Sequence, residues 1–158
     1  MIVLGINGID DIFHDASASL IVNNQIITSV EEERFNRKKH TNGIPFNAID
    51  YCLKSAKIRF SDIDHVVYYI NPPDLKTYFV DNILKQYIKT DDKENKGMFS
   101  KLFTKNVENP PYLQHIQNTS KNMQNLKSIL NRKYEMSDKT QFHFINHHIA
   151  HASSAYYI

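Results

Sequence analysis

Residues 16–30 read ASASLIVNNQIITSV, and this stretch decides the fold of the chain. Between Ala16 and Val22, apolar side chains occupy every second position, which is typical of one face of a half-buried β-strand. The Asn-Asn pair at 23–24 tolerates left-handed backbone dihedrals, and residues 25–30 supply a returning strand. The stretch therefore predicts an antiparallel hairpin.

Further strands and helices extend this hairpin into a layered fold. Short apolar runs predict strands at residues 1–7, 66–70 and 142–145. Apolar residues at helical spacing predict one helix that Pro45 opens and another over 112–134, whose inward residues are Ile116, Met123, Leu126 and Leu130. Three leading strands followed by alternating helices and strands predict an α/β fold in which helices flank a mixed sheet.

Two more helices begin at residues suited to cap them. Asp74 is expected to cap one helix, and Asn146 is expected to cap a final helix that starts at His147. Residues 89–111 are polar and rich in Lys and Asn, which predicts a flexible loop or insertion. Because no glycine or proline ends the final helix before Ile158, we expect residues 1–158 to be one lobe of a longer protein.

The composition is that of an ordinary globular domain. Of 158 residues, 41% are hydrophobic and 23% are charged. The net charge of +2 is too small to indicate nucleic acid or an anionic membrane as the main partner. No apolar run reaches the roughly 18 residues that a membrane span needs. Cys52 stands alone, which excludes an internal disulfide and suits a reducing compartment, so we expect a cytoplasmic protein.

A pair of histidines near the end of the chain has the spacing of metal ligands. His147 and His151 are four residues apart, so on a helix they share a face one turn apart. The positive end of the helix dipole disfavours an imidazolium at His147, and neutral imidazole is the form that binds metal. Two nitrogens do not complete a site, and polar surface histidines would show the same spacing.

A second group follows the first strand. His14 stands after a turn-rich stretch, at the mouth of the predicted sheet, where an imidazole can act as a general base. Asp10, Asp11 and Asp15 are placed to orient this histidine or to hold a cation. Ordinary turn chemistry explains the same residue types, because aspartates cap turns and loop histidines are usually solvated.

The third group is the charge run at residues 31–40, which reads EEERFNRKKH. Arg34, Arg37, Lys38 and Lys39 are candidates to clamp a phosphate or carbamoyl anion. A solvated face with internal salt bridges would produce the same pattern. Spacing alone does not separate these two interpretations.

Taken together, these segments resemble the O-carbamoyltransferase family, which includes the nebramycin/tobramycin, cephamycin and nodulation-factor carbamoyltransferases. The resemblance rests on LGING at residues 4–8, FHDASASL at 13–20, the charge run at 31–40 and HHIAHASSAYY at 147–157. These stretches occur in the order that the family has. Residues 71–141 show no match and look enlarged.

The resemblance implies a fold and an activity. The fold would be an actin-like, ribonuclease-H-like ATPase lobe, similar to the tRNA threonylcarbamoyl-transfer subunit, whose N-terminal lobe opens with three strands. A C-terminal domain, similar to threonylcarbamoyl-adenylate synthase, would make carbamoyl adenylate from carbamoyl phosphate and ATP. The first domain would then pass the carbamoyl group to a hydroxyl of a small-molecule acceptor. An antibiotic sugar, a nodulation oligosaccharide and a surface polysaccharide all remain open as acceptors.

The resemblance also implies roles for individual residues. His147 and His151 match two histidines that hold a divalent, iron-type metal, for which Zn²⁺ is an alternative. His14 matches the active-site histidine beside the acceptor. Asp11 neighbours Ile12, which stands where a close relative has an acidic residue, so Asp11 is a candidate substitute. The remaining metal carboxylates and the adenylate-forming domain would lie beyond the last residue.

Other functions fit the same residues. A truncated lobe without transfer activity could serve as a binding or docking module, and its uncovered apolar surface would favour a homo-oligomer. A sugar- or acetate-kinase-like relative of the same fold would need glycine-rich phosphate loops, whereas the chain has only four glycines.

Overall fold

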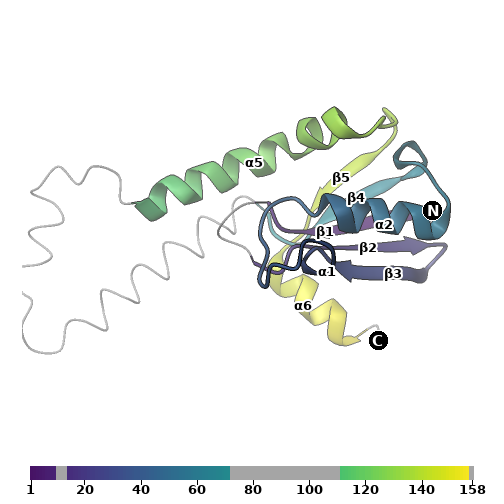
Figure 1. Ribbon diagram of the computed structural model, residues 1–158, viewed down its shortest axis with the longest axis horizontal. Coiled ribbons are helices and arrows are strands. Elements are labelled where there is room, and N and C mark those ends of the chain that lie inside the picture. Colours follow the sequence, from purple (N-terminus) through teal and green to yellow (C-terminus); the bar gives the residue numbers. More distant parts are fainter. Residues whose placement is uncertain (10–13, 72–110, 157–158) are drawn as a thin grey trace, which may run out of the picture.

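The computed structural model describes residues 1–9, 14–71 and 111–156. Within these residues a five-stranded mixed sheet has the strand order β3-β2-β1-β4-β5 (Figure 1). The strands are β1 (Ile2–Asn7), β2 (Ser17–Val22), β3 (Gln25–Glu31), β4 (His65–Tyr68) and β5 (Gln141–Phe144). The helices are α1 (Glu33–Asn36), α2 (Phe46–Ala56), the 3₁₀ helix η1 (Phe60–Asp62), α5 (Pro111–Lys133) and α6 (His147–Tyr156).

The predicted hairpin is confirmed. Strands β2 and β3 pair antiparallel, and the turn residues Asn23 and Asn24 have φ values of 49° and 66°. This left-handed conformation matches the twist of the flanking strands. The predicted alternation also holds, because Ala16, Ala18 and Leu20 are buried while the serines between them are only partly buried.

Strand β1 joins the hairpin to the rest of the sheet. It pairs antiparallel with β2 and parallel with β4, which in turn pairs parallel with β5. The carboxyl ends of β1 and β4 therefore lie at the same edge of the sheet. The α/β fold with a mixed, helix-flanked sheet that the sequence predicts is confirmed in these described residues.

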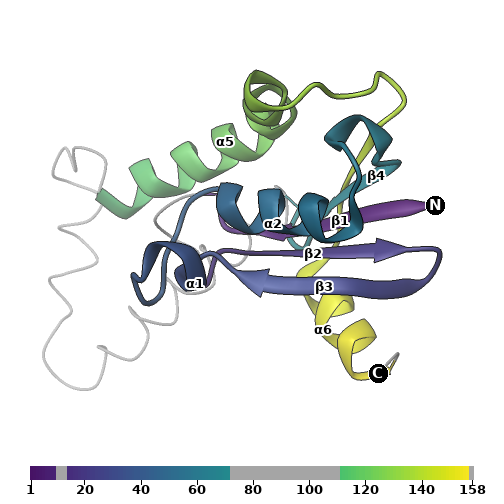
Figure 2. The same cartoon turned by 45° about the vertical axis from the view of Figure 1, so that its right-hand side comes forward.

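One face of the sheet carries the hydrophobic core. Helices α2 and α5 lie on the same side of the sheet, as both Figure 1 and Figure 2 show. They bury apolar residues against the inward side chains of β1, β2 and β4, among them Leu4, Ile6, Leu20, Ile49, Leu53, Val66, Tyr68, Met123, Leu126 and Leu130. The opposite face, toward α6, presents the small residues Gly5, Ser17 and Ser19. Within the described residues, the hydrophobic core therefore lies on one face of the sheet, and small and polar residues line the other.

Some element boundaries differ from the sequence expectation. Pro45 precedes the first residue of α2, with φ −80° and ψ 66°, rather than occupying its first turn. The charge run contains an unpredicted single-turn helix, α1, which ends at Arg37 in a left-handed conformation. The helix expected after Asp74 lies outside the described residues, and so does the loop expected at 89–111 except for its last residue. That residue, Pro111, is not in a loop but begins α5. Among the described helices, none is long and apolar enough to cross a membrane.

Glu32 shows that the charge run is not simply a solvated face. Its side chain is only 6% exposed, and its carboxylate accepts hydrogen bonds from the backbone N–H groups of Asn47 (3.3 Å) and Ala48 (2.8 Å). The carboxylate also accepts a 2.6 Å bond from the Asn47 side-chain amide. Glu32 therefore caps the amino end of α2, where Pro45 provides no side-chain cap. This contact ties the charge run to the core.

Candidate functional site

A cleft of about 460 Å³ opens on the face of the sheet that points toward α6. Its floor is formed by the carboxyl-terminal parts of β1 and β4 and by the start of β2. Its walls come from the loop before β2 and from α6. The lining residues are Gly5, Ile6, Asn7, His14, Asp15, Ser17, Ser19, Val67, Tyr69, His147 and His151. The structure therefore places the three histidines singled out from the sequence along one cleft.

The two histidines of α6, which we call the helix pair, face each other across one helical turn. The Nε2 atoms of His147 and His151 are 3.1 Å apart, and their ring centroids are 4.4 Å apart. Two metal–nitrogen bonds of about 2.0–2.1 Å that enclose ~90–110° place their nitrogens ~2.9–3.4 Å apart. The observed separation of the two Nε2 atoms lies within that interval.

The start of α6 sets the position of the helix pair. The side-chain oxygen of Asn146 accepts hydrogen bonds from the backbone N–H groups of His148 (3.0 Å) and Ile149 (3.2 Å). These are the orphan donors of a first helical turn, so the predicted cap at Asn146 is confirmed. The helix consequently begins at His147, as the sequence predicts.

The environment of His147 favours its neutral form. Burial, followed by the neighbouring imidazoles of His151 and His148, lowers the pKa of His147 below its ordinary value. The Tyr69 ring packs beside the His147 ring, with centroids 5.2 Å apart and an angle of 56° between the ring planes. A neutral imidazole with a free lone pair is what a metal ligand requires.

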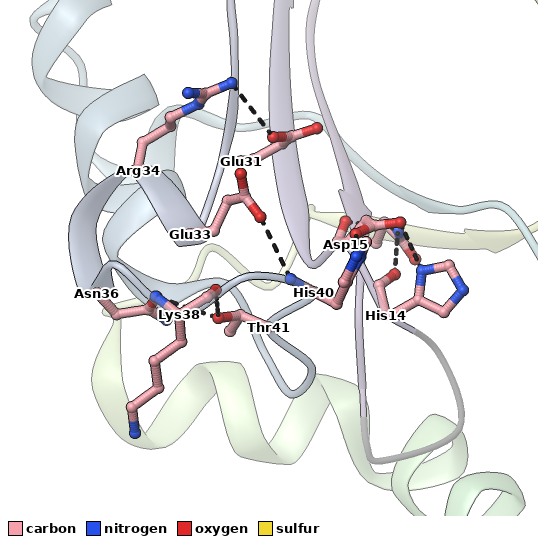
Figure 3. Close-up of polar contacts among 10 residues, drawn as sticks. His14, Asp15, Glu31, Glu33, Arg34, Asn36, Lys38, His40 and Thr41 are labelled. Atoms are coloured by element: carbon pink, nitrogen blue, oxygen red, sulfur yellow. Dashed lines mark hydrogen bonds and ion pairs between the residues drawn. The ribbon is translucent and has the colours of Figure 1, made fainter.

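A second group, which we call the loop cluster, comprises His14, Asp15 and His40. The carboxylate of Asp15 lies between the two imidazoles, as Figure 3 shows. One of its oxygens is 2.5 Å from Nδ1 of His14, and the other is 2.9 Å from Nδ1 of His40. Hydrogen bonds from His40 and His14 lower the pKa of Asp15, so the carboxylate is charged at neutral pH. An ionised carboxylate only accepts, which makes both imidazoles Nδ1–H donors.

Contacts from β1 and α1 hold the loop cluster in place. The side-chain amide of Asn7, at the end of β1, donates to the carbonyls of Asp15 (2.9 Å) and His14 (3.4 Å). The backbone N–H of His40 donates to the Glu33 carboxylate at 3.3 Å (Figure 3). Together with the hydrogen bond between His40 and Asp15, these contacts fix the loop before β2 relative to the loop after α1.

Gly8 allows the loop before β2 to lie close to the segment that contains Thr41 and Gly43. Its φ of 95° lies in the region that favours glycine, and a Cβ there would sit 2.5 Å from the Gly43 carbonyl and 2.6 Å from Cβ of Ala16. A hydrogen bond of 2.8 Å from the Ala16 N–H to the Thr41 carbonyl fixes the same approach.

Two polar atoms on the cleft residues lack hydrogen-bond partners within the described part of the chain. These are Oδ1 of Asn7 and Nδ1 of His147, and both are buried. Buried polar atoms are normally paired, so such atoms beside a cleft mark places where a ligand, water or further chain can bind. A metal-bound imidazole usually donates its second N–H to an acceptor, and the described residues provide none for His147.

The basic residues of the charge run lie elsewhere. Arg34, Arg37 and Lys39 are not among the residues that line the cleft, although the last residue of their run, His40, reaches the loop cluster. Arg34 instead lies 3.8 Å from the Glu31 carboxylate at the surface. A role for these cations in anion binding stays a prediction. Asp11 lies outside the described residues.

Sequence reasoning missed Asn7, His40 and Tyr69. Asn7 directly follows the apolar run of β1, so an amide at a strand end was a usable signal for a residue at the sheet edge. His40 ends the charge run, where spacing gave no reason to bring it to Asp15, 25 residues earlier. Tyr69 follows β4 and carries no local signal.

The comparisons with known proteins point to one family. A family model described as carbamoyltransferase N-terminus matches residues 5–158. The chain is 29% identical over 144 residues to nodulation protein NolNO of Sinorhizobium fredii, which covers 90% of this chain and 17% of that protein. It is also 42% identical over 65 residues to an uncharacterised Synechocystis protein, covering 41% of this chain and 11% of the relative.

A shorter relative matches as well. An uncharacterised 19.2 kDa protein of Rhizobium etli is 46% identical over 56 residues, which cover 35% of this chain and 33% of that protein. The chain thus spans at most about a third of these three relatives in the matched regions.

Proposed function

The chain belongs to the carbamoyltransferase N-terminal family, and we propose that it forms part of an enzyme that transfers a carbamoyl group to a hydroxyl. The observation that carries this proposal is the convergence of His14, His147 and His151 on one cleft. The donor would be carbamoyl adenylate, made from carbamoyl phosphate and ATP elsewhere in the whole protein. The three leading strands of the mixed sheet support an actin-like, ribonuclease-H-like lobe.

His14 is the general base of this proposal. Its Nδ1–H donates to Asp15, so the tautomer leaves the lone pair on Nε2, and His14 lines the cleft. Nε2 accepts the proton of the acceptor hydroxyl while that oxygen bonds to the carbamoyl carbon. The bond between the carbamoyl group and the phosphate oxygen breaks, and AMP leaves with the bonding electrons. Asp15 positions the imidazole and stabilises the imidazolium that forms.

The helix pair fits a divalent transition metal. His147 and His151 supply two imidazole nitrogens at a suitable separation, and the lowered pKa of His147 favours the neutral ligand form. A complete coordination sphere needs further ligands from outside the described residues. A bound Fe²⁺ or Zn²⁺ would supply Lewis-acid polarisation or charge neutralisation at the donor. Asn146 fixes the start of the helix that carries both imidazoles, and Tyr69 packs beside the His147 ring.

The proposal is tested with the full-length protein that contains this chain. Carbamoyl phosphate, ATP and a panel of sugar and oligosaccharide alcohols are supplied, and carbamoylated product is measured by mass spectrometry. His14→Asn should lower the rate at least ~100-fold, in line with the loss of a general base. His65→Asn is the matched control, since His65 is absent from the cleft lining. Equal rates for His14→Asn and His65→Asn would remove His14 from the chemistry.

A further inference from the structure

The loop cluster has the composition of a metal site in its own right. His14, Asp15 and His40 offer two imidazole nitrogens and one carboxylate oxygen, and these ligand atoms all lie within 4.8 Å of one another. Two histidines and one carboxylate are a recurrent donor set for divalent transition metals, with zinc and iron the common occupants. The set is distinct from the helix pair, because it shares no residue with His147 or His151.

The geometry points to a Zn²⁺-type site formed by His14, Asp15 and His40, and we propose that this chain binds a divalent transition metal there. The Asp15 carboxylate already contacts both Nδ1 atoms, so a metal needs only small side-chain rotations to replace the two N–H···O contacts. The ring centroids of His14 and His40 are 5.6 Å apart in an edge-to-face arrangement, which leaves both Nδ1 atoms directed at the carboxylate.

The backbone holds these three ligands before any metal arrives. Asp15 and His40 have φ values of 62° and 53°, a left-handed conformation that few residue types other than glycine adopt readily. Asn7 fixes the carbonyls beside His14 and Asp15, and Glu33 fixes the N–H of His40. Ligands that are already positioned lose little conformational entropy on binding.

The electrostatics and the exposure agree with a cation site. The lowered pKa of Asp15 leaves a charged carboxylate as the central ligand. The side chains of His14, Asp15 and His40 are 70%, 43% and 74% exposed, so a metal can enter from solvent and retain water or substrate as further ligands.

A metal bound at the loop cluster would prevent His14 from acting as the general base. This consequence alone rests on the proposed function. A neutral imidazole that binds metal through Nδ1 carries its proton on Nε2. The lone pair needed to accept the proton of the acceptor hydroxyl is then absent. Zinc at the loop cluster would therefore inhibit carbamoyl transfer by the full-length enzyme, and removal of zinc by a chelator would restore the rate.

Zinc binding is tested with this chain alone, by isothermal titration against Zn²⁺. The starting protein carries His147→Asn and His151→Asn, which remove the helix pair. We expect one zinc per chain, with the Hε1 NMR signals of His14 and His40 shifting together. His40→Asn or Asp15→Asn should weaken binding ~10- to 100-fold, comparable to losing a key ligand contact. Asparagine tolerates the left-handed backbone at both positions, so the loops keep their conformation.

His65→Asn is the matched control, because His65 belongs to another histidine pair, 3.0 Å from His143, which is not part of a three-ligand cluster among the described residues. It should change zinc affinity less than about twofold. Loss of affinity in His65→Asn, but not in His40→Asn, would overturn the site, as would absence of zinc binding in the starting protein. Neither result would contradict the proposal that the enzyme transfers a carbamoyl group. Zinc binding without inhibition of the full-length enzyme would keep the site and refute His14 as the base.

Discussion

The loop cluster and the helix pair bring imidazoles to the same cleft by different means. In the helix pair, helical periodicity alone places His147 and His151 on one face, and a local cap at Asn146 fixes where the helix starts. In the loop cluster, His14 and His40 come from two loops that are joined only through tertiary contacts. The helix pair should therefore withstand changes in packing that dismantle the loop cluster.

The largest loss of stability, confined to the side of the loop cluster, should come from Gly8→Ala. The new Cβ would clash with Gly43 and Ala16, and the residue would be strained at φ 95°. We expect a loss of about 3 kcal/mol in the free energy of unfolding, measured by urea denaturation. Gly43→Ala is the control, since Gly43 has φ 85° but a Cβ added there would meet no atom of the described residues within 4 Å. Strain alone should therefore cost about 1 kcal/mol. Equal losses for both variants would refute the close approach at Gly8.

A somewhat smaller loss is expected for Glu32→Ala. The substitution removes the carboxylate that caps α2 and leaves the N–H groups of Asn47 and Ala48 unpaired. The free energy of unfolding should fall by about 2 kcal/mol in thermal or urea unfolding. Glu31→Ala, which removes only an exposed ion pair with Arg34, should cost less than about 0.5 kcal/mol. A larger effect at Glu31 than at Glu32 would contradict the cap.

The helix pair is perturbed locally by Asn146→Ala. Loss of the cap should destabilise the start of α6 by about 1 kcal/mol and speed amide exchange at His148 and Ile149 by ~5-fold. Asn146→Asp keeps an acceptor at the same position and adds a charge that suits a helix amino end, so it should preserve protection. Exchange rates in Asn146→Ala that equal those of the parent would show that the cap contributes nothing.

The smallest expected effect is on the pH dependence of stability, measured in the chelator-treated chain, where the two groups act in different pH ranges. Because burial and neighbouring imidazoles lower the pKa of His147, the folded state binds fewer protons there than the unfolded state. Its contribution to stability is complete above the unfolded pKa of about 6.5 and is lost as pH falls through the lower folded pKa. The pKa of Asp15 is also lowered, so its contribution to stability is likewise lost as pH falls. That loss begins only below the unfolded pKa of about 3.9.

Unfolding followed at a series of pH values separates these two windows. His147→Asn should flatten the dependence just below neutral pH and leave the acidic limb unchanged, whereas Asp15→Asn should flatten the acidic limb. The reverse assignment would contradict the protonation states described for the two groups.

The contrast also explains how far the sequence could be read. The hairpin, the mixed sheet, the cap at Asn146 and the facing of His147 and His151 follow from local periodicity and local hydrogen bonding, which a sequence displays directly. The contact between Asp15 and His40, and the cap that Glu32 provides for α2, depend on how loops pack against a core. Residue spacing does not predict that packing, so the sequence alone does not distinguish Glu32 from the glutamates on either side of it.

That the loop cluster and the helix pair open on one cleft is the central claim. A crystal structure of this chain grown with Zn²⁺, with anomalous scattering recorded at the zinc edge, tests it most directly. We predict zinc between His14, Asp15 and His40, with the rings of His147 and His151 lining the same cleft. Rings of His14 and His147 on opposite faces of the sheet would contradict the claim.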